Sequence, residues 1–180
     1  MGSIKAFSME KLVIGILISE PALRERLLCE LAGLFGPLDF TSQELEFTYS
    51  RYYDREMGGP IRRFFVCFHE LVEPQRLSTL KRATNALEDR LRVEGRRKIN
   101  LDPGLLSLNR FILASTKNSF HRIPLAEGIY GEITLIYQRG AFRPLEWTYP
   151  DYHSPEYLEI LDSIRDLYRR QLKGQARTSG

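Results

Sequence analysis

Three basic side chains fall close together in one predicted loop, at Lys117, His121 and Arg122. Cationic groups gathered in this way suit an anion such as phosphate. Histidine titrates near neutral pH, so His121 is the candidate acid or base of the site. Two carboxylates complete the candidate catalytic set, Asp102 just past a predicted strand end and Glu132 on a later strand. A carboxylate in such a site acts as a general base or as a ligand for a hard cation.

The segments that follow add hydroxyl and aromatic groups to this set. Thr134 projects from the same side of its predicted strand as Glu132, and the segment EWTYPDY contributes Trp147, Tyr149 and Asp151. Aromatic faces beside cations suit a nucleotide base or a sugar ring. We therefore predict a site for a small phosphorylated or nucleotide-like ligand, GTP included, and leave catalysis open. The alternative is that the charges are ordinary surface groups and that the aromatic side chains pack under the last helix.

A second group of polar and aromatic residues precedes the predicted third strand. Its members are Tyr52, Tyr53, Arg55, Glu56, Arg62 and Arg63. The connection at 50–60 contains a Gly-Gly-Pro sequence, and long connections of this kind are often functional. We predict that this group forms either one wall of the same pocket or a partner surface, with a plain solvated loop as the alternative.

Several familiar chemistries are disfavoured by residue spacing. The histidines at 69, 121 and 153 are far apart, so no metal site is predicted. No lysine lies in a Walker A loop, and the string TKNS at 116–119 lacks the Asp that would bind a guanine edge. There is no GxSxG segment to carry a serine nucleophile. The sequence identifies no cofactor.

The competing interpretation is a non-enzymatic module that binds protein or RNA. RNA-recognition domains share the strand and helix order predicted below and stack bases on sheet aromatics. The segment 65–68 (FVCF) resembles the end of their RNP1 pattern, but the first strand, LVIGIL, has no aromatic residue. The basic run at 90–98 suits a phosphate backbone, although such runs are more often a solvated helix end. Nucleic-acid binding is therefore disfavoured.

The hydrophobic pattern predicts the elements that position these residues. Apolar runs and alternation predict strands at 11–19, 44–49, 62–71 and 98–101, and helical spacing predicts helices at 21–35 and 74–91. The order βαββαβ predicts an α+β fold with a ferredoxin-like core, in which two helices cover one face of an antiparallel sheet. The sequence Asp102-Pro103-Gly104 is a turn signal and is expected to end the fourth strand.

Further elements extend this core. Strands are predicted at 109–116 and 129–137, and Ser154-Pro155-Glu156 is a clear start for a C-terminal helix. We predict a loose lead-in over 1–10, a single α+β domain over 11–173 and a disordered tail over 174–180.

The composition is that of an ordinary globular domain. The 180 residues are 43% hydrophobic, and 26 basic side chains nearly balance 23 acidic ones. No apolar run approaches the ~20 residues of a membrane span, and no signal peptide is expected. The two cysteines, Cys29 and Cys67, lie in apolar runs and are predicted to be buried thiols, which suits a reducing cytoplasm. We predict a cytoplasmic protein with no membrane partner and leave its oligomeric state open.

Seven strings of the sequence occur together in a bacterial family. They are KLVIGILIS, YYDREMG, NLDPG, LASTK, HRI, GIYGEITLIY and WTYPDY, in this order, between Lys11 and Leu172. The chain therefore resembles an uncharacterised domain-of-unknown-function family of about this length, whose members are sometimes labelled GTP-binding protein. The resemblance implies a cytoplasmic bacterial protein and supplies neither an activity nor catalytic residues. The missing Walker A loop and Ser119 in place of Asp give the GTP label no support from motifs.

Overall fold

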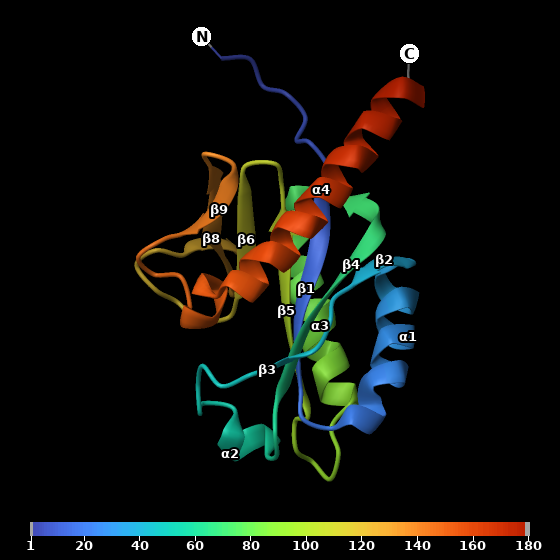
Figure 1. Ribbon diagram of the computed structural model, residues 1–180, viewed down its shortest axis with the longest axis vertical. Coiled ribbons are helices and arrows are strands. Elements are labelled where there is room, and N and C mark those ends of the chain that lie inside the picture. The colour runs from blue at the N-terminus through green and yellow to red at the C-terminus, as the bar shows by residue number, and fades with distance from the viewer. Residues whose placement is uncertain (1, 179–180) are drawn as a thin grey trace.

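One large antiparallel sheet organises the fold (Figure 1). The computed structural model describes residues 2–178, with side chains described for residues 2–175. Within this part of the chain the sheet has nine strands in the order β2-β4-β1-β5-β6-β8-β7, with β3 paired to β4 and β9 paired to β8. The prediction of a mixed helix and strand fold with a large antiparallel sheet and a C-terminal helix is confirmed.

The elements follow one another along residues 2–178 with short connections. The strands are β1 (Glu10–Ile18), β2 (Leu38–Thr41), β3 (Leu45–Glu46), β4 (Arg62–Val72), β5 (Ile99–Leu106), β6 (Arg110–Ser115), β7 (Ile123–Ala126), β8 (Ile129–Gln138) and β9 (Ala141–Pro144). The helices are α1 (Arg24–Phe35), α2 (Asp54–Met57), α3 (Leu77–Arg90) and α4 (Pro155–Thr178). Short 3₁₀ turns, each with a proline at its start, precede α1, α3 and α4. Proline suits the first position because its fixed φ is already helical.

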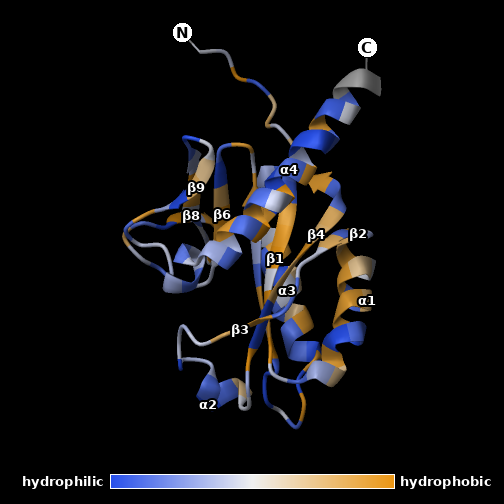
Figure 2. Cartoon of the chain, in the orientation of Figure 1, coloured by the Kyte–Doolittle hydropathy of each residue, from blue (hydrophilic) through white to orange (hydrophobic). Residues whose placement is uncertain are grey.

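The two faces of the sheet carry different apolar layers. On one face, Leu27 of α1 and Leu80 of α3 share a buried cluster with Phe64 of β4. On the other face, Leu161 of α4 shares a cluster with Phe65 of β4. Figure 2 shows β4 and much of β1 in hydrophobic colours between these layers, whereas α4 mixes hydrophobic and hydrophilic residues. β1 is buried along its whole length, which confirms the prediction of a strand covered on both faces.

The sheet opens along the N-terminal half of β5. This strand pairs with β1 over its full length but with β6 only from Gly104 to Leu106. At the open edge, side chains of α3 satisfy the backbone of Leu101. Lys81 Nζ donates to the Leu101 carbonyl at 2.7 Å, and Glu88 Oε1 accepts from the Leu101 N–H at 2.7 Å. The outward-facing backbone groups of Leu101 are therefore paired although β6 does not reach this part of β5.

The prediction of a turn at Asp102-Pro103-Gly104 is wrong, because all three residues lie within β5. The open edge explains why a proline fits there. N–H groups two residues apart point to the same side of a strand, and the Leu101 N–H points away from β1, toward Glu88. The Pro103 nitrogen faces the same open side, where no ladder hydrogen bond is lost.

Other boundaries also differ from those predicted. Of the strand predicted at 44–49, only Leu45–Glu46 pairs with β4, and the short strand β2 pairs with β4 beside it. Four residues are too few for β2 to show a period in the sequence. Cys67 is buried as predicted, but Cys29 is exposed because it lies on the outer side of α1.

The two ends of the chain differ from each other. Residues 2–9 form no helix or strand and are exposed. At the other end α4 continues to Thr178, well into the segment 174–180 that is predicted to be disordered, and residues 179–180 lie outside the described residues. Figure 1 shows this end of α4 extending past the edge of the sheet.

Candidate functional site

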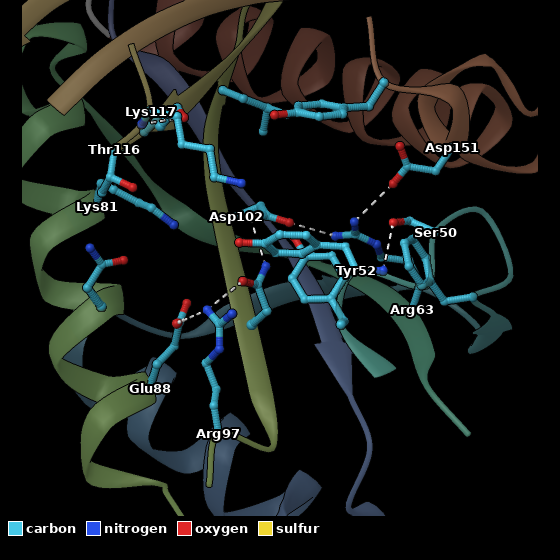
Figure 3. Close-up of a pocket in the computed structure, with 18 of the residues that line it drawn as sticks. Ser50, Tyr52, Arg63, Lys81, Glu88, Arg97, Asp102, Thr116, Lys117 and Asp151 are labelled. Carbon is cyan, nitrogen blue, oxygen red and sulfur yellow. Dashed lines mark hydrogen bonds and ion pairs between the residues drawn. The ribbon is translucent and has the colours of Figure 1, made fainter. Parts of the chain in front are cut away.

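A cleft of about 710 Å³ occupies the opening between β5 and β6 (Figure 3). Segments far apart in the sequence line it: the connection at 47–56, α3, β5, the end of β6 with the loop after it, and the turn before α4. Basic and acidic side chains are equally numerous in the lining. They are Arg63, Lys81, Arg92, Arg97, Lys117 and Arg122, against Glu56, Glu88, Asp89, Asp102, Glu132 and Asp151.

Arg63 of β4 forms the floor of the cleft, with a side chain only 3% exposed. Its Nη1 donates to Asp102 Oδ2 at 3.1 Å, and its Nη2 donates to Asp151 Oδ2 at 3.0 Å. Burial by itself lowers the pKa of Arg63, but the acidic groups around it, among them Tyr152, Asp102 and Asp151, raise the pKa above its ordinary value. Arg63 is therefore a permanent cation that joins β4, β5 and the turn before α4.

Gly15 of β1 makes room for this guanidinium. A Cβ at position 15 would lie 2.7 Å from Arg63 Nη1 and 3.1 Å from the Tyr152 hydroxyl oxygen. The rings of Phe65 and Tyr157 also flank Arg63, each with its centroid 5.7 Å from the guanidinium carbon. The floor is thus packed so closely that a side chain at position 15 would displace the Arg63 guanidinium.

The α3 side of the cleft is joined to the floor by a chain of hydrogen bonds. Arg97 Nη1 donates to Glu88 Oε2 at 3.2 Å and to Asn100 Oδ1 at 3.0 Å. Asn100 Nδ2 in turn donates to Asp102 Oδ1 at 3.0 Å. Burial raises the pKa of Glu88, and the positive charge of Lys81 only partly opposes this effect. Both oxygens of Asp102 are therefore oriented by neighbours before any ligand arrives.

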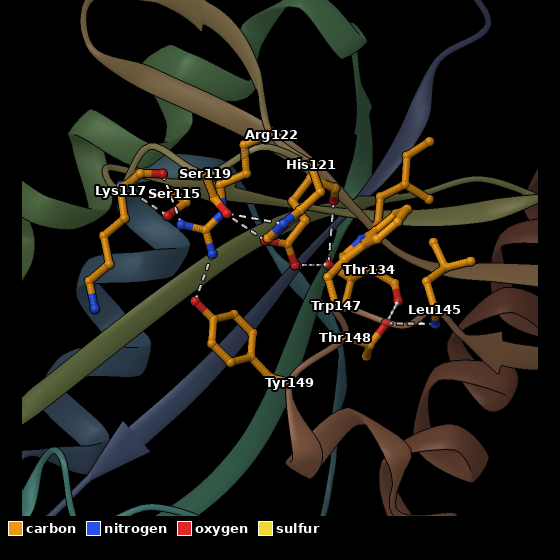
Figure 4. A network of polar contacts seen from close by, with 12 residues as sticks. Ser115, Lys117, Ser119, His121, Arg122, Thr134, Leu145, Trp147, Thr148 and Tyr149 are labelled. Carbon is orange, nitrogen blue, oxygen red and sulfur yellow. Dashed lines mark hydrogen bonds and ion pairs between the residues drawn. The ribbon is translucent and has the colours of Figure 1, made fainter.

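Glu132 forms the opposite wall and is held by a buried polar network (Figure 4). Its Oε2 accepts from Arg122 Nε at 2.7 Å and from His121 Nε2 at 3.0 Å. The His121 ring stacks on Trp147 with centroids 5.4 Å apart, and Thr134 Oγ1 donates to Glu132 Oε1 at 3.5 Å. These contacts orient the Glu132 carboxylate from behind.

Arg122 also organises the mouth of the cleft. Its Nη2 donates to the Tyr149 hydroxyl at 2.7 Å, and its Nη1 donates to the Lys117 carbonyl at 2.8 Å. Burial alone lowers the pKa of Arg122, but its hydrogen bonds to Glu132 and Tyr149 raise the pKa above its ordinary value. The Lys117 side chain crosses the mouth, where its Nζ lies 4.4 Å from the centroid of the Tyr52 ring.

Both lysines of the cleft lining, Lys81 and Lys117, have no carboxylate within 4.0 Å among the described residues. Figure 3 shows both of their ammonium groups pointing into the cleft, with Thr116 beside them and Asp102 farther in. Every arginine in the cleft lining, by contrast, has an acidic partner. The lysines are therefore the cations of the cleft that retain the capacity to pair.

The structure brings six of the predicted site residues to one cleft: Asp102, Lys117, Arg122, Glu132, Tyr149 and Asp151. The other three, His121, Thr134 and Trp147, lie behind Glu132 rather than on the cleft surface. Their side chains support the Glu132 wall, so the direct ligand contacts predicted for His121 and Trp147 do not fit this arrangement. In the second predicted group, Tyr52, Tyr53, Glu56 and Arg63 line the same cleft, whereas Arg55 and Arg62 do not.

Sequence reasoning missed the contribution of α3. Lys81 and Glu88 lie on the same side of the helix as the apolar stripe that contains Leu80 and Leu87, and all four are buried. Charged residues are rarely buried without a partner. Two of them seven positions apart within such a stripe therefore indicate that both hydrogen-bond to polar groups inside the protein.

Two general properties concern the described residues as a whole. No group of three or more His, Cys, Asp or Glu side chains among residues 2–175 has an arrangement that could hold a metal ion. Over residues 2–178, no helix has the length and apolarity needed to cross a membrane.

Fold and cleft together define a class: a single-sheet α+β protein whose sheet opens around a charged cleft. Within that class, the chain belongs to the family described as Domain of unknown function (DUF4416), whose profile matches residues 8–168. This match confirms the resemblance to a domain-of-unknown-function family. No curated protein and no solved structure matches the chain significantly.

Proposed function

We propose that the cleft binds a small phosphorylated ligand. The observation that carries this proposal is the pair of ammonium groups, on Lys81 and Lys117, that face the cleft without a carboxylate partner among the described residues. A phosphate needs charge-assisted hydrogen bonds from such donors. The hydroxyl of Thr116, which lines the same part of the cleft, adds a neutral donor.

The remaining lining suits the non-phosphate part of such a ligand. Tyr52 and Tyr149 border the mouth of the cleft and offer aromatic faces to a base or a sugar. The volume of about 710 Å³ lies within the range typical of small-molecule sites. GTP is therefore one candidate among several nucleotides and sugar phosphates.

In this proposal Arg122 and His121 are positioning residues. Arg122 is already bound to Glu132, Tyr149 and the Lys117 carbonyl, so its role is to hold the mouth and the Lys117 backbone in place. Of the carboxylates predicted for the site, Asp102 is the one best placed to contact a ligand, because its side chain is 24% exposed, against 7% for Asp151 and 2% for Glu132. Whether a reaction follows binding stays a prediction for which Asp102 and Glu132 are the candidate groups.

Isothermal titration calorimetry tests the proposal with inorganic phosphate, GTP and a sugar phosphate, each with and without Mg²⁺. We expect at least one of them to bind, and Lys117→Ala to weaken that binding by about tenfold, as for the loss of one hydrogen bond to a charged group. The matched control is Lys5→Ala, because Lys5 is exposed in the segment before β1. No binding by any probe, or binding that Lys117→Ala leaves unchanged, would reject the proposal.

A protein-binding module remains the second candidate, favoured by one observation. Phe120, Ile123 and Leu125 are exposed together at and before the edge strand β7, and exposed apolar edges of this kind mark contact sites. RNA binding has weaker support, because Arg90 and Arg97 of the basic run are paired with acidic side chains. Size-exclusion chromatography with Ile123→Lys distinguishes self-association at this edge from a monomer.

We also propose that residues 10–106 form a ferredoxin-like unit. The support is the antiparallel order β2-β4-β1-β5, together with α1 and α3 packed on one face. A cytoplasmic location and a bacterial source stay predictions from the sequence.

A further inference from the structure

We propose that Asp102 and the floor around Arg63 form a second subsite, which takes a protonated amine, so that the ligand is a zwitterion with a phosphate at one end and an ammonium at the other. This inference rests on the proposed function, because the phosphate end is the one assigned to Lys81 and Lys117. It adds the chemical class of the other end of the ligand.

The charge on the floor is the first argument. One guanidinium, on Arg63, is shared by two carboxylates, so the trio of Arg63, Asp102 and Asp151 carries one uncompensated negative charge. Asp151 is only 7% exposed, whereas Asp102 is 24% exposed and lines the cleft. The uncompensated charge is therefore presented to a ligand by Asp102. A buried or half-buried charge without a full partner is costly, and an incoming cation removes that cost.

A hydroxyl group on the same floor is the second, independent argument. The Tyr152 side chain is 2% exposed, lines the cleft, and its hydroxyl has no hydrogen-bond partner among the described residues. Buried polar groups are normally paired, and an exception calls for a ligand or a water. The hydroxyl lies beside Arg63, within 3.1 Å of the point where a Cβ of Gly15 would be. An ammonium bound at Asp102 has further hydrogens to donate to such an acceptor.

The lining as a whole fits a ligand that carries charges of both signs better than a simple anion. Its basic and acidic side chains are equal in number, so the cleft as a whole does not favour either sign. The two ammonium groups that lack a carboxylate partner are nevertheless set apart from the floor. Figure 3 shows the ammonium groups of Lys81 and Lys117 on one side of Asp102, and Arg63 with Asp151 on the other. Such a separation matches a molecule that carries both charges.

A divalent metal ion fits the floor less well than an ammonium. Oδ2 of Asp102 and Oδ2 of Asp151 both accept from Arg63, so the guanidinium occupies the place between the two carboxylates where a metal would bind both. A doubly charged ion would also stand next to that fixed cation. An ammonium needs only the remaining lone pairs of Asp102 and carries a single charge.

Calorimetry with two matched probes, ethyl phosphate and 2-aminoethyl phosphate, tests the inference on the wild-type chain. We expect the amine to improve affinity about tenfold, the effect of one hydrogen bond to a charged group. N-Acetylation of the amine, which removes its charge, should return the affinity to that of ethyl phosphate. In Asp102→Asn the two probes should bind equally, because the carboxylate that accepts from the ammonium is gone. Asp166→Asn, at an exposed ion pair on α4, is the matched control.

The outcomes separate this inference from the proposed function. If both probes bind wild-type protein equally, the amine subsite is rejected and the phosphate site stands. If neither probe binds, both proposals fail together. Binding of Mg²⁺ alone that is lost in Asp102→Asn would replace the amine subsite by a cation site. If Asp102→Asn does not fold, the wild-type comparison of amine with acetylated amine still decides the matter, and Tyr152→Phe, which keeps the ring, provides the second variant.

Discussion

The two halves of β5 show how one strand can serve both the core and the cleft. In the C-terminal half, Gly104–Leu106 pairs with β6 on one side and with β1 on the other. In the N-terminal half, β6 does not pair with β5, and α3 side chains hydrogen-bond to the backbone of Leu101 instead. The paired half is buried and closely packed, whereas the open half borders charged side chains. A gap in strand pairing, rather than an added domain, therefore creates the cleft.

The largest effect is expected from disrupting the paired half. In Gly104→Ala, the new Cβ would lie 2.6 Å from the Ile112 carbonyl oxygen and from the Phe111 ring. Backbone cannot yield as a flexible side chain does, so we expect a loss of about 3 kcal/mol in the free energy of unfolding. Urea denaturation measures this loss. The matched control is Gly33→Ala on α1, where a Cβ meets nothing within 4 Å, and a gain of about 0.5 to 1 kcal/mol is expected. Equal changes in the free energy of unfolding for Gly104→Ala and Gly33→Ala would show that the paired half of β5 is not closely packed.

The open half should respond to the loss of its side-chain partners. Lys81→Met keeps the length of the side chain but leaves the buried Leu101 carbonyl without its donor. We expect a loss of about 2 kcal/mol in the free energy of unfolding, the cost of one unpaired buried group. Arg92→Met, at the exposed ion pair with Asp89, should change stability by less than about 0.5 kcal/mol. If the two variants lose the same free energy of unfolding, the α3 side chains do not replace β6 as hydrogen-bond partners of β5.

The pH dependence of stability should also differ at the open edge. Burial raises the folded-state pKa of Glu88 above its ordinary value of 4.5, so in the window above that value the folded chain holds more protons than the unfolded chain. The contribution of Glu88 to the free energy of unfolding therefore falls as pH rises through this window. In Glu88→Gln the contribution is absent. Thermal unfolding between about pH 4 and pH 7 should show wild type losing stability relative to the variant as pH rises, and the opposite trend would disprove the assignment.

The smallest effect on stability is expected at the mouth of the cleft. Tyr52 is exposed and contacts Lys117 through its ring. In Tyr52→Ala the free energy of unfolding should change by less than about 0.5 kcal/mol, as for other surface substitutions. The affinity for a nucleotide should fall more than that for inorganic phosphate, because only a nucleotide has a base or sugar that could contact the ring in the proposed site. A large loss of stability would instead make Tyr52 part of the core.

Much of the fold could be predicted from the sequence because burial is periodic. The stripe of α3, from Leu77 to Leu91, and the continuous apolar run of β1 are both buried as expected. The start of α4 at Pro155 follows from a serine cap, whose Oγ accepts from the Tyr157 N–H at 3.3 Å. The sequence Asp102-Pro103-Gly104 misled because a proline in an unpaired strand edge has the same local signature as a turn.

The candidate site could be predicted only in part. Lys117, Arg122 and Glu132 are close in sequence within the segment that runs from β6 through β7 to β8, so their proximity in space follows from the pairing of these strands. Lys81 comes from another element, α3. Its hydrogen bond to the Leu101 carbonyl is possible only because β6 does not pair with this half of β5. Strand pairing joins segments that are far apart in the chain, so no local sequence pattern predicts it.

By itself, then, the sequence determined the local elements, the faces they bury and the small set of charged residues worth testing. Only the tertiary structure decided that β5 and β6 are unpaired on the N-terminal side of Gly104. It also decided that Arg63 is buried between Asp102 and Asp151, and that His121 and Trp147 lie behind Glu132. The physical reason is that burial and helix capping depend on neighbours within a few residues. The meeting of charges across a cleft depends instead on chain segments that strand pairing brings together.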